Sequence, residues 1–114
     1  MKQVVVVIAA IFTEASCTAF CAMSAYAGSG RPGSCTGQNL GYGNLSRTGV
    51  SECFTAINGA CGLIVNNARG SGCNCTVNFF SGGGCSQTLV GTLACSRIGA
   101  LLQVNFDHFN LECY

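Results

Sequence analysis

Apolar and polar residues alternate in short runs through the second half of the chain, and glycine-rich segments separate these runs. One face of the stretch from Cys73 to Phe80 carries Cys73, Cys75, Val77 and Phe79, and the other carries Asn74, Thr76, Asn78 and Phe80. This two-residue period predicts a strand. The segment from Ala100 to Phe106 alternates in the same way, and Ser81 to Gly84 predicts a turn between strands. The pattern favours an all-β, mainly antiparallel domain over βα units.

Two further apolar runs flank Asn58-Gly59, a dipeptide typical of tight hairpin turns because both residues tolerate positive φ. We therefore expect strands at Glu52 to Ile57 and at Cys61 to Asn66. A short helix from Val50 to Ile57 is the alternative. Gln87 to Val90 predicts one more strand, and the C-terminal strands continue to Cys113.

The first 27 residues have a different pattern, typical of a secretory signal peptide. Lys2 precedes the uninterrupted apolar run Val4 to Phe12, and small residues follow as far as Ala25-Tyr26-Ala27. Glu14 interrupts a run already too short for a membrane anchor, so we expect no membrane span. The predicted organisation is a signal peptide at 1–27, an irregular glycine-rich arm at 28–49 and a cysteine-rich β domain at 50–114.

Cysteine parity favours cleavage after Ala27 over cleavage after Ala19, because the later cut removes Cys17 and Cys21 and leaves an even number of cysteines. In an exported chain of this size these cysteines predict four disulfides, and all of them are assigned to this stapling role: Cys35, Cys53, Cys61, Cys73, Cys75, Cys85, Cys95 and Cys113. Among the many pairings that eight cysteines allow, Cys75 with Cys113 and Cys85 with Cys95 are our first choices. A zinc site is disfavoured, since Cys73, Cys75 and the single His108 lack a second closely spaced ligand pair.

The charged residues after Ala27 exclude several functions. This part of the chain has four arginines, three acidic residues and no lysine, which gives it a net charge of +1. It therefore lacks the surplus of basic residues that binding to nucleic acid requires. Asp107 and Glu112 lie near the end of the chain and are read as solvated charges. His108 is the sole histidine and is read as a surface imidazole. We expect no catalytic residues, no metal and no cofactor.

The stretch from Cys75 to Cys85, followed by a closing strand that ends in Cys113, resembles small secreted cysteine-rich proteins of filamentous fungi. The resemblance implies a small disulfide-stapled β-sandwich of the Greek-key, βγ-crystallin-like type, as in some yeast killer toxins and fungal effectors. Asn66 to Ser71 is similar to the crystallin calcium clamp, but Gly70 stands where a hydroxyl ligand belongs.

These features lead to a functional expectation: a secreted, monomeric, effector-type or virulence-type protein that binds an extracellular host protein or wall component. The alternatives are a killer-toxin-like antimicrobial and a hydrolase inhibitor that presents the loop Asn66 to Gly72. Asn44 and Asn74 each begin an N-glycosylation sequon. The exposed candidates for contact with a target are Tyr42, Arg69, Phe80 and His108, and for each of them ordinary surface or edge packing is the favoured interpretation.

Overall fold

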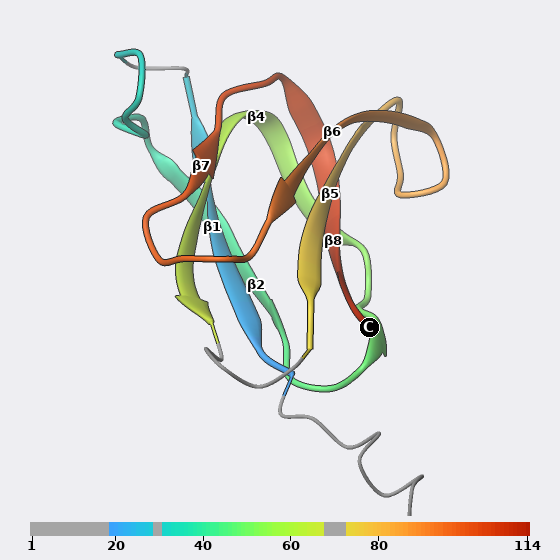
Figure 1. The fold of residues 1–114 in the computed structure, drawn as a ribbon. Helices are drawn as coiled ribbons and strands as arrows, with labels where there is room; N and C mark the ends of the chain where they lie inside the picture. The colour runs from blue at the N-terminus through green and yellow to red at the C-terminus, as the bar shows by residue number, and fades with distance from the viewer. Residues whose placement is uncertain (1–18, 29–30, 68–72) are drawn as a thin grey trace, which may run out of the picture.

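The computed structural model describes residues 19–28, 31–67 and 73–114, and in these residues it contains strands and no helix. All strand pairs are antiparallel. The strands are β1 (Cys21–Ala27), β2 (Asn39–Leu45), β3 (Gly49–Val50), β4 (Phe54–Asn67), β5 (Cys75–Ser81), β6 (Thr88–Ala94), β7 (Leu101–Leu102) and β8 (Phe106–Cys113) (Figure 1). The expectation of an all-β, antiparallel fold is confirmed. The finer sandwich and Greek-key assignment stays a prediction.

The long strand β4 joins two halves of the sheet, whose strand order is β2-β1-β4-β8-β5-β6. The C-terminal part of β4 pairs with β1 and β7, and its N-terminal part pairs with β8. Asn58 lies between the two parts with a φ of 69°, a left-handed conformation that asparagine adopts more readily than most residues. The register against β8 shifts between Thr55 and Gly59. The predicted hairpin at Asn58-Gly59 is therefore wrong: these residues form an irregularity inside one strand, and the alternative helix is absent as well.

The hydrophobic core takes residues from both halves of the sheet. Gly62 of β4 lets them approach closely, because a Cβ atom there would lie 2.6 Å from the ring of Phe79 and 2.9 Å from the sulfur of Met23. The Phe79 ring packs edge-on against Phe106 with centroids 4.9 Å apart. The bulkiest core side chains are fully buried: Phe79, Phe109, Met23, Ile64, Leu111 and Val77.

Four disulfides connect the described parts of the chain: Cys21–Cys95, Cys35–Cys61, Cys53–Cys85 and Cys75–Cys113. Cys73 is also disulfide-bonded. The predicted Cys75–Cys113 pair is confirmed, and these residues face one another on neighbouring strands β5 and β8. The predicted Cys85–Cys95 pair is wrong, because Cys85 is bonded to Cys53 and Cys95 is bonded to Cys21.

The predicted boundary after Ala27 does not fit this fold. Cys21–Ala27 forms β1, which lies between β2 and β4, and its first five residues are buried. Cys21 is itself bonded to Cys95. The small residues that looked like the end of a leader are small because a central strand packs there. The remainder of the predicted signal peptide, residues 1–18, lies outside the described residues.

Two other expectations are corrected in detail. The predicted irregular arm at 28–49 contains β2. This strand could not be predicted from its composition, because it is rich in glycine and asparagine, which are uncommon in strands. The predicted strand from Ala100 to Phe106 is interrupted: β7 holds Leu101 and Leu102, and Phe106 begins β8. The expected strands at the positions of β5 and β6 are confirmed.

Candidate functional site

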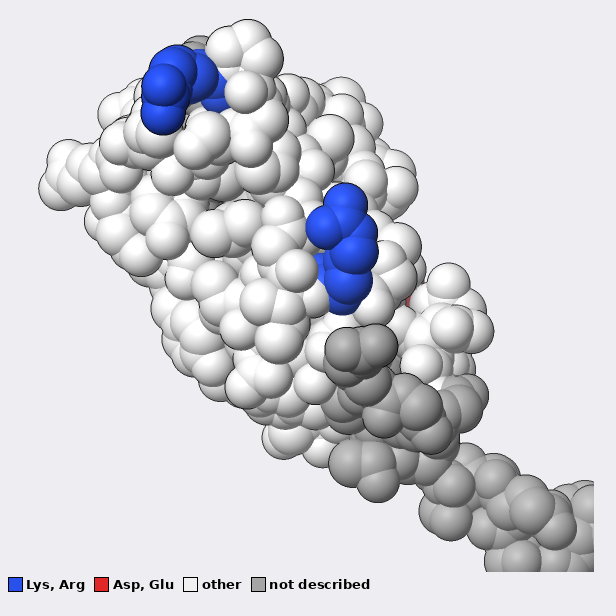
Figure 2. Space-filling view, turned by 60° about the vertical axis from the view of Figure 1, so that its left-hand side comes forward, with Lys and Arg blue, Asp and Glu red and all other residues white. Residues whose placement is uncertain are grey.

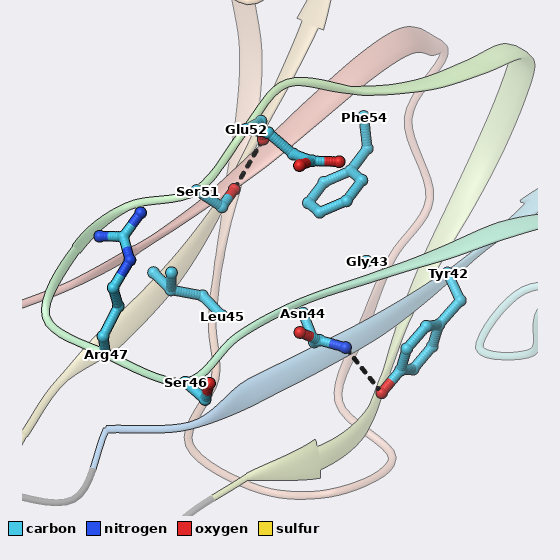
Figure 3. A pocket seen from close by; sticks show the side chains of 9 residues that line it. All are labelled: Tyr42, Gly43, Asn44, Leu45, Ser46, Arg47, Ser51, Glu52 and Phe54. Carbon is cyan, nitrogen blue, oxygen red and sulfur yellow. Dashed lines mark hydrogen bonds between the residues drawn. The ribbon is translucent and has the colours of Figure 1, made fainter.

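An open groove of about 580 Å³ lies between β2 and the segment that leads from β3 into β4. Figure 3 shows the side chains that line it, with Tyr42 and Asn44 on one side and Glu52 and Phe54 on the other. The other lining residues are Gly43, Leu45, Ser46, Arg47 and Ser51. The groove is thus built by two segments that are neighbours in sequence but belong to different halves of the sheet.

Exposed and buried residues alternate along β2, and this alternation determines which side chains of the strand a ligand can reach. Tyr42 and Asn44 are exposed, whereas Gly43 and Leu45 between and after them are buried. Gly43 faces the ring of Phe54, which stacks on Phe109 with centroids 5.2 Å apart. The Phe54 ring therefore gives the groove an apolar part, and Tyr42 and Asn44 add an aromatic ring and an amide.

The loop between β2 and β4 is fixed by hydrogen bonds from its own side chains. The guanidinium of Arg47 donates to the carbonyl oxygens of Thr48 and Val50, both at 3.1 Å. The hydroxyl of Ser51 donates to the Glu52 carbonyl at 2.8 Å and accepts from the backbone N–H of Leu111 at 2.8 Å. These bonds hold the Glu52 side of the groove against β8, so the groove is formed before any ligand arrives.

The polar groups of the groove balance in charge, with one carboxylate at Glu52 and one guanidinium at Arg47. Tyr42 is 53% exposed, a large fraction for an aromatic side chain. The Nδ2 group of Asn44 donates a hydrogen bond to the Tyr42 hydroxyl at 3.3 Å, which orients the two side chains along the rim (Figure 3). Such a surface offers a flat apolar ring beside hydrogen-bonding groups of both kinds.

The structure separates the candidates for contact with a target. Tyr42 lines the groove, whereas Phe80 and His108 face one another on β5 and β8 and are not among its lining residues. Phe80 is half-buried, on the face opposite the fully buried Phe79. Arg69 lies outside the described residues, as does most of the calcium-clamp and inhibitor-loop segment at 66–72. Sequence reasoning missed Phe54, Arg47 and the groove-facing role of Glu52, because no local motif signals a site that two halves of a sheet create together.

His108 belongs to a small polar cluster at the start of β8. Its Nδ1 atom lies 2.7 Å from Oδ1 of Asp107. The other Asp107 oxygen accepts a hydrogen bond from the backbone N–H of Gly82 at 3.1 Å. The hydrogen bond from His108 lowers the pKa of Asp107 below its ordinary value of 3.8, and the backbone N–H groups of Gly82 and Gly83 lower it further against an opposing effect of partial burial. The cluster holds the glycine-rich β5–β6 turn against β8.

A second hollow, also of about 580 Å³, adjoins this cluster. Ile57, Asn58, Ser81 and Asp107 are among its lining residues. Ile57 is 55% exposed. Within the described ranges no group of three or more histidine, cysteine or acidic side chains is placed to hold a metal ion.

Both predicted glycosylation acceptors are exposed, but their surroundings differ. Asn44 lies near the end of β2, which is the last strand at its edge of the sheet path, and Ser46 follows in an exposed loop. Asn74 instead exchanges two backbone hydrogen bonds with Tyr114, at 2.9 and 2.8 Å. Its neighbour Cys75 is bonded to Cys113.

No protein-family model, curated protein or solved structure matches the chain significantly. Disulfides at this density are typical of extracellular proteins. The described part of the chain has no helix that is long and apolar enough to cross a membrane.

Proposed function

We propose that the chain is an exported, effector-type binding protein and that its groove binds a neutral polysaccharide of a cell wall. The observation that carries the proposal is an open groove whose lining includes the exposed ring of Tyr42 on one side and the carboxylate of Glu52 on the other. Disulfide stapling supports a role outside the cell, where such bonds persist.

A sugar ring presents C–H groups on its faces and hydroxyl groups around its edge. The exposed face of Tyr42 suits the former, because an aromatic ring is both apolar and flat. Glu52 accepts hydrogen bonds from hydroxyl groups, and Asn44 and Arg47 carry N–H donors. The balance of one negative and one positive side chain favours a neutral polymer over a polyanion.

The shape of the groove favours a polymer over a small, enclosed ligand. Small-molecule sites usually bury most of the ligand's surface, whereas this groove is open to solvent. Its loop is already fixed by Arg47 and Ser51, so little conformational entropy is lost on binding. These properties suit repeated weak contacts along a wall polymer.

The killer-toxin alternative has less support. The described arginines, Arg31, Arg47 and Arg97, are all exposed, and a membrane-damaging face needs cationic residues gathered over an apolar stripe. Figure 2 shows basic side chains far apart on the face in view, with neutral surface between them.

The test is sedimentation of the protein with insoluble chitin, cellulose and β-1,3-glucan, using full-length protein exported to a bacterial periplasm so that Asn44 carries no glycan. We expect at least one polymer to pull down the wild type. Tyr42→Ala and Glu52→Gln should each weaken that binding about tenfold, which corresponds to about 1.4 kcal/mol.

The matched controls are Tyr114→Ala and Glu112→Gln, which remove a similar ring and a similar carboxylate outside the groove. Both should bind as the wild type does. The proposal fails if none of the three polymers sediments the protein, or if the groove variants bind as well as the controls.

A further inference from the structure

We propose that Asn44 carries an N-linked glycan whose first sugar packs on Tyr42, and that this glycan blocks the binding of polysaccharide at Tyr42. This proposal rests on the proposed function, because the ligand that the glycan would exclude is the wall polysaccharide. We therefore expect only protein without a glycan on Asn44 to bind the polysaccharide.

The position of Asn44 suits modification. Its side chain is exposed on β2, a strand with a neighbour on one side only along the sheet path. Ser46, the hydroxyl residue of the sequon, is exposed immediately after the strand ends. The product is therefore compatible with the folded chain, because a bulky substituent at Nδ2 extends away from the buried Gly43 and Leu45.

The transfer reaction uses a polyprenyl-diphosphate-linked oligosaccharide as the donor. The Asn44 nitrogen forms a bond to C1 of the first sugar, and the bond from C1 to the diphosphate oxygen breaks. The diphosphate leaves with the electron pair, and Nδ2 loses one proton. The one hydrogen that remains on Nδ2 is still able to donate to Tyr42.

Tyr42 gives the attached sugar a surface to pack on. It lies two residues before Asn44, so both side chains project from the same face of β2. Nδ2 of Asn44 already lies 3.3 Å from the Tyr42 hydroxyl, and the ring is 53% exposed. A sugar linked to Nδ2 begins beside this ring. It occupies the place that a wall polysaccharide would take.

The test uses wild-type protein secreted by a eukaryotic host under conditions of partial glycosylation. The sample is sedimented with the polymer that binds the bare bacterial protein, and intact masses are measured in pellet and supernatant. Peptide mapping assigns the glycan to Asn44. We expect the pellet to be enriched at least tenfold in the form that is bare at Asn44, and the binding capacity to fall in proportion to the glycosylated fraction.

The matched control is Asn74→Gln, which removes the other sequon and should leave the enrichment unchanged. Protein from the same host with assembly of the lipid-linked oligosaccharide blocked should regain full capacity. The proposal is overturned if Asn44 is bare in all secreted protein, or if the glycosylated form reaches the pellet in the same proportion as in the input.

A second readout does not depend on polysaccharide binding. If the sugar packs on Tyr42, the glycosylated form should unfold at a temperature about 4 °C higher than the bare form, and Tyr42→Ala should remove that difference. Equal unfolding temperatures in the wild-type background would refute the packing. If the bare protein binds no polymer, the proposed function fails, while the mass and unfolding measurements still decide whether Asn44 is modified and packed.

Discussion

Gly43 of β2 lies directly against the ring of Phe54: a Cβ atom at position 43 would lie 2.7 Å from that ring and 2.8 Å from the ring of Phe109. The two phenylalanines stack on one another, so neither ring is able to move away without disturbing the core. The absence of a side chain at Gly43 therefore sets the distance between the two walls of the groove.

We expect Gly43→Ala to destabilise the protein by about 1–3 kcal/mol, because overpacking forces the rings or the backbone to shift. Urea unfolding with the disulfides intact measures the change. Gly84→Ala is the control, since a Cβ there meets no atom within 4 Å; it should change stability by less than about 1 kcal/mol. Equal effects at the two glycines would contradict the packing of Gly43 against Phe54.

The disulfide from Cys21 to Cys95 should contribute more to stability than the one from Cys53 to Cys85. The first spans 74 residues and ends at a fully buried cysteine, whereas the second spans 32 and ends at an exposed one. In the chain-entropy description, a disulfide that closes the longer loop stabilises the folded state by about 4 kcal/mol, because it lowers the entropy of the unfolded chain. The double variant Cys21→Ala/Cys95→Ala also leaves a cavity.

Thermal unfolding of that double variant and of Cys53→Ala/Cys85→Ala tests the order. The variant that lacks the Cys21–Cys95 bridge should unfold at the lower temperature. The opposite order would show that β1 is not held in the core as the structure has it.

Asp107 should make stability depend on pH in the acid range. Its pKa is lower in the folded protein than its ordinary value of 3.8. The ionised carboxylate therefore stabilises the fold above that value, and the contribution is lost as the pH falls through the lower folded value. Asp107→Asn should lower the unfolding temperature at pH 7, and the difference from wild type should shrink below pH 3.8.

Glu112→Gln on the same strand is the control for a change of charge without the Gly82 and His108 contacts. A gap between wild type and Asp107→Asn that stays constant from pH 7 to pH 2.5, about one unit below the ordinary value, would contradict a role for the ionised carboxylate.

The parts of the fold that could be predicted from sequence are those with local periodicity. β5 alternates clearly from Cys75 to Phe79, and its position and its buried face followed from that alternation. The Cys75–Cys113 bridge was chosen because both cysteines were expected on inward faces of strands, and it is present. β1 could not be recognised, because a buried strand of small residues has the same composition as the end of a signal peptide. Only tertiary pairing with β2 and β4 distinguishes the two.

The residues of the groove were harder to predict from the sequence than the strands were. Tyr42 was one of the four candidate contact residues, but Glu52 and Phe54 join it only because the chain crosses from one half of the sheet to the other. The same limit applies to Asn58, whose positive φ was anticipated while its place inside β4 was not. A hairpin turn and a strand irregularity require the same backbone conformation.

We expect β1 to belong to the mature protein and to support the groove. Along the sheet path β2 pairs with β1 alone, so cleavage after Ala27 would remove the strand that holds Tyr42 and Asn44 in place. The most direct test is the intact mass of the exported protein, with sequencing of its N-terminus. We predict a first residue at or before Ala19 and a peptide in which Cys21 is bonded to Cys95. A chain that begins at Gly28 would contradict the fold, the groove and the function proposed for it.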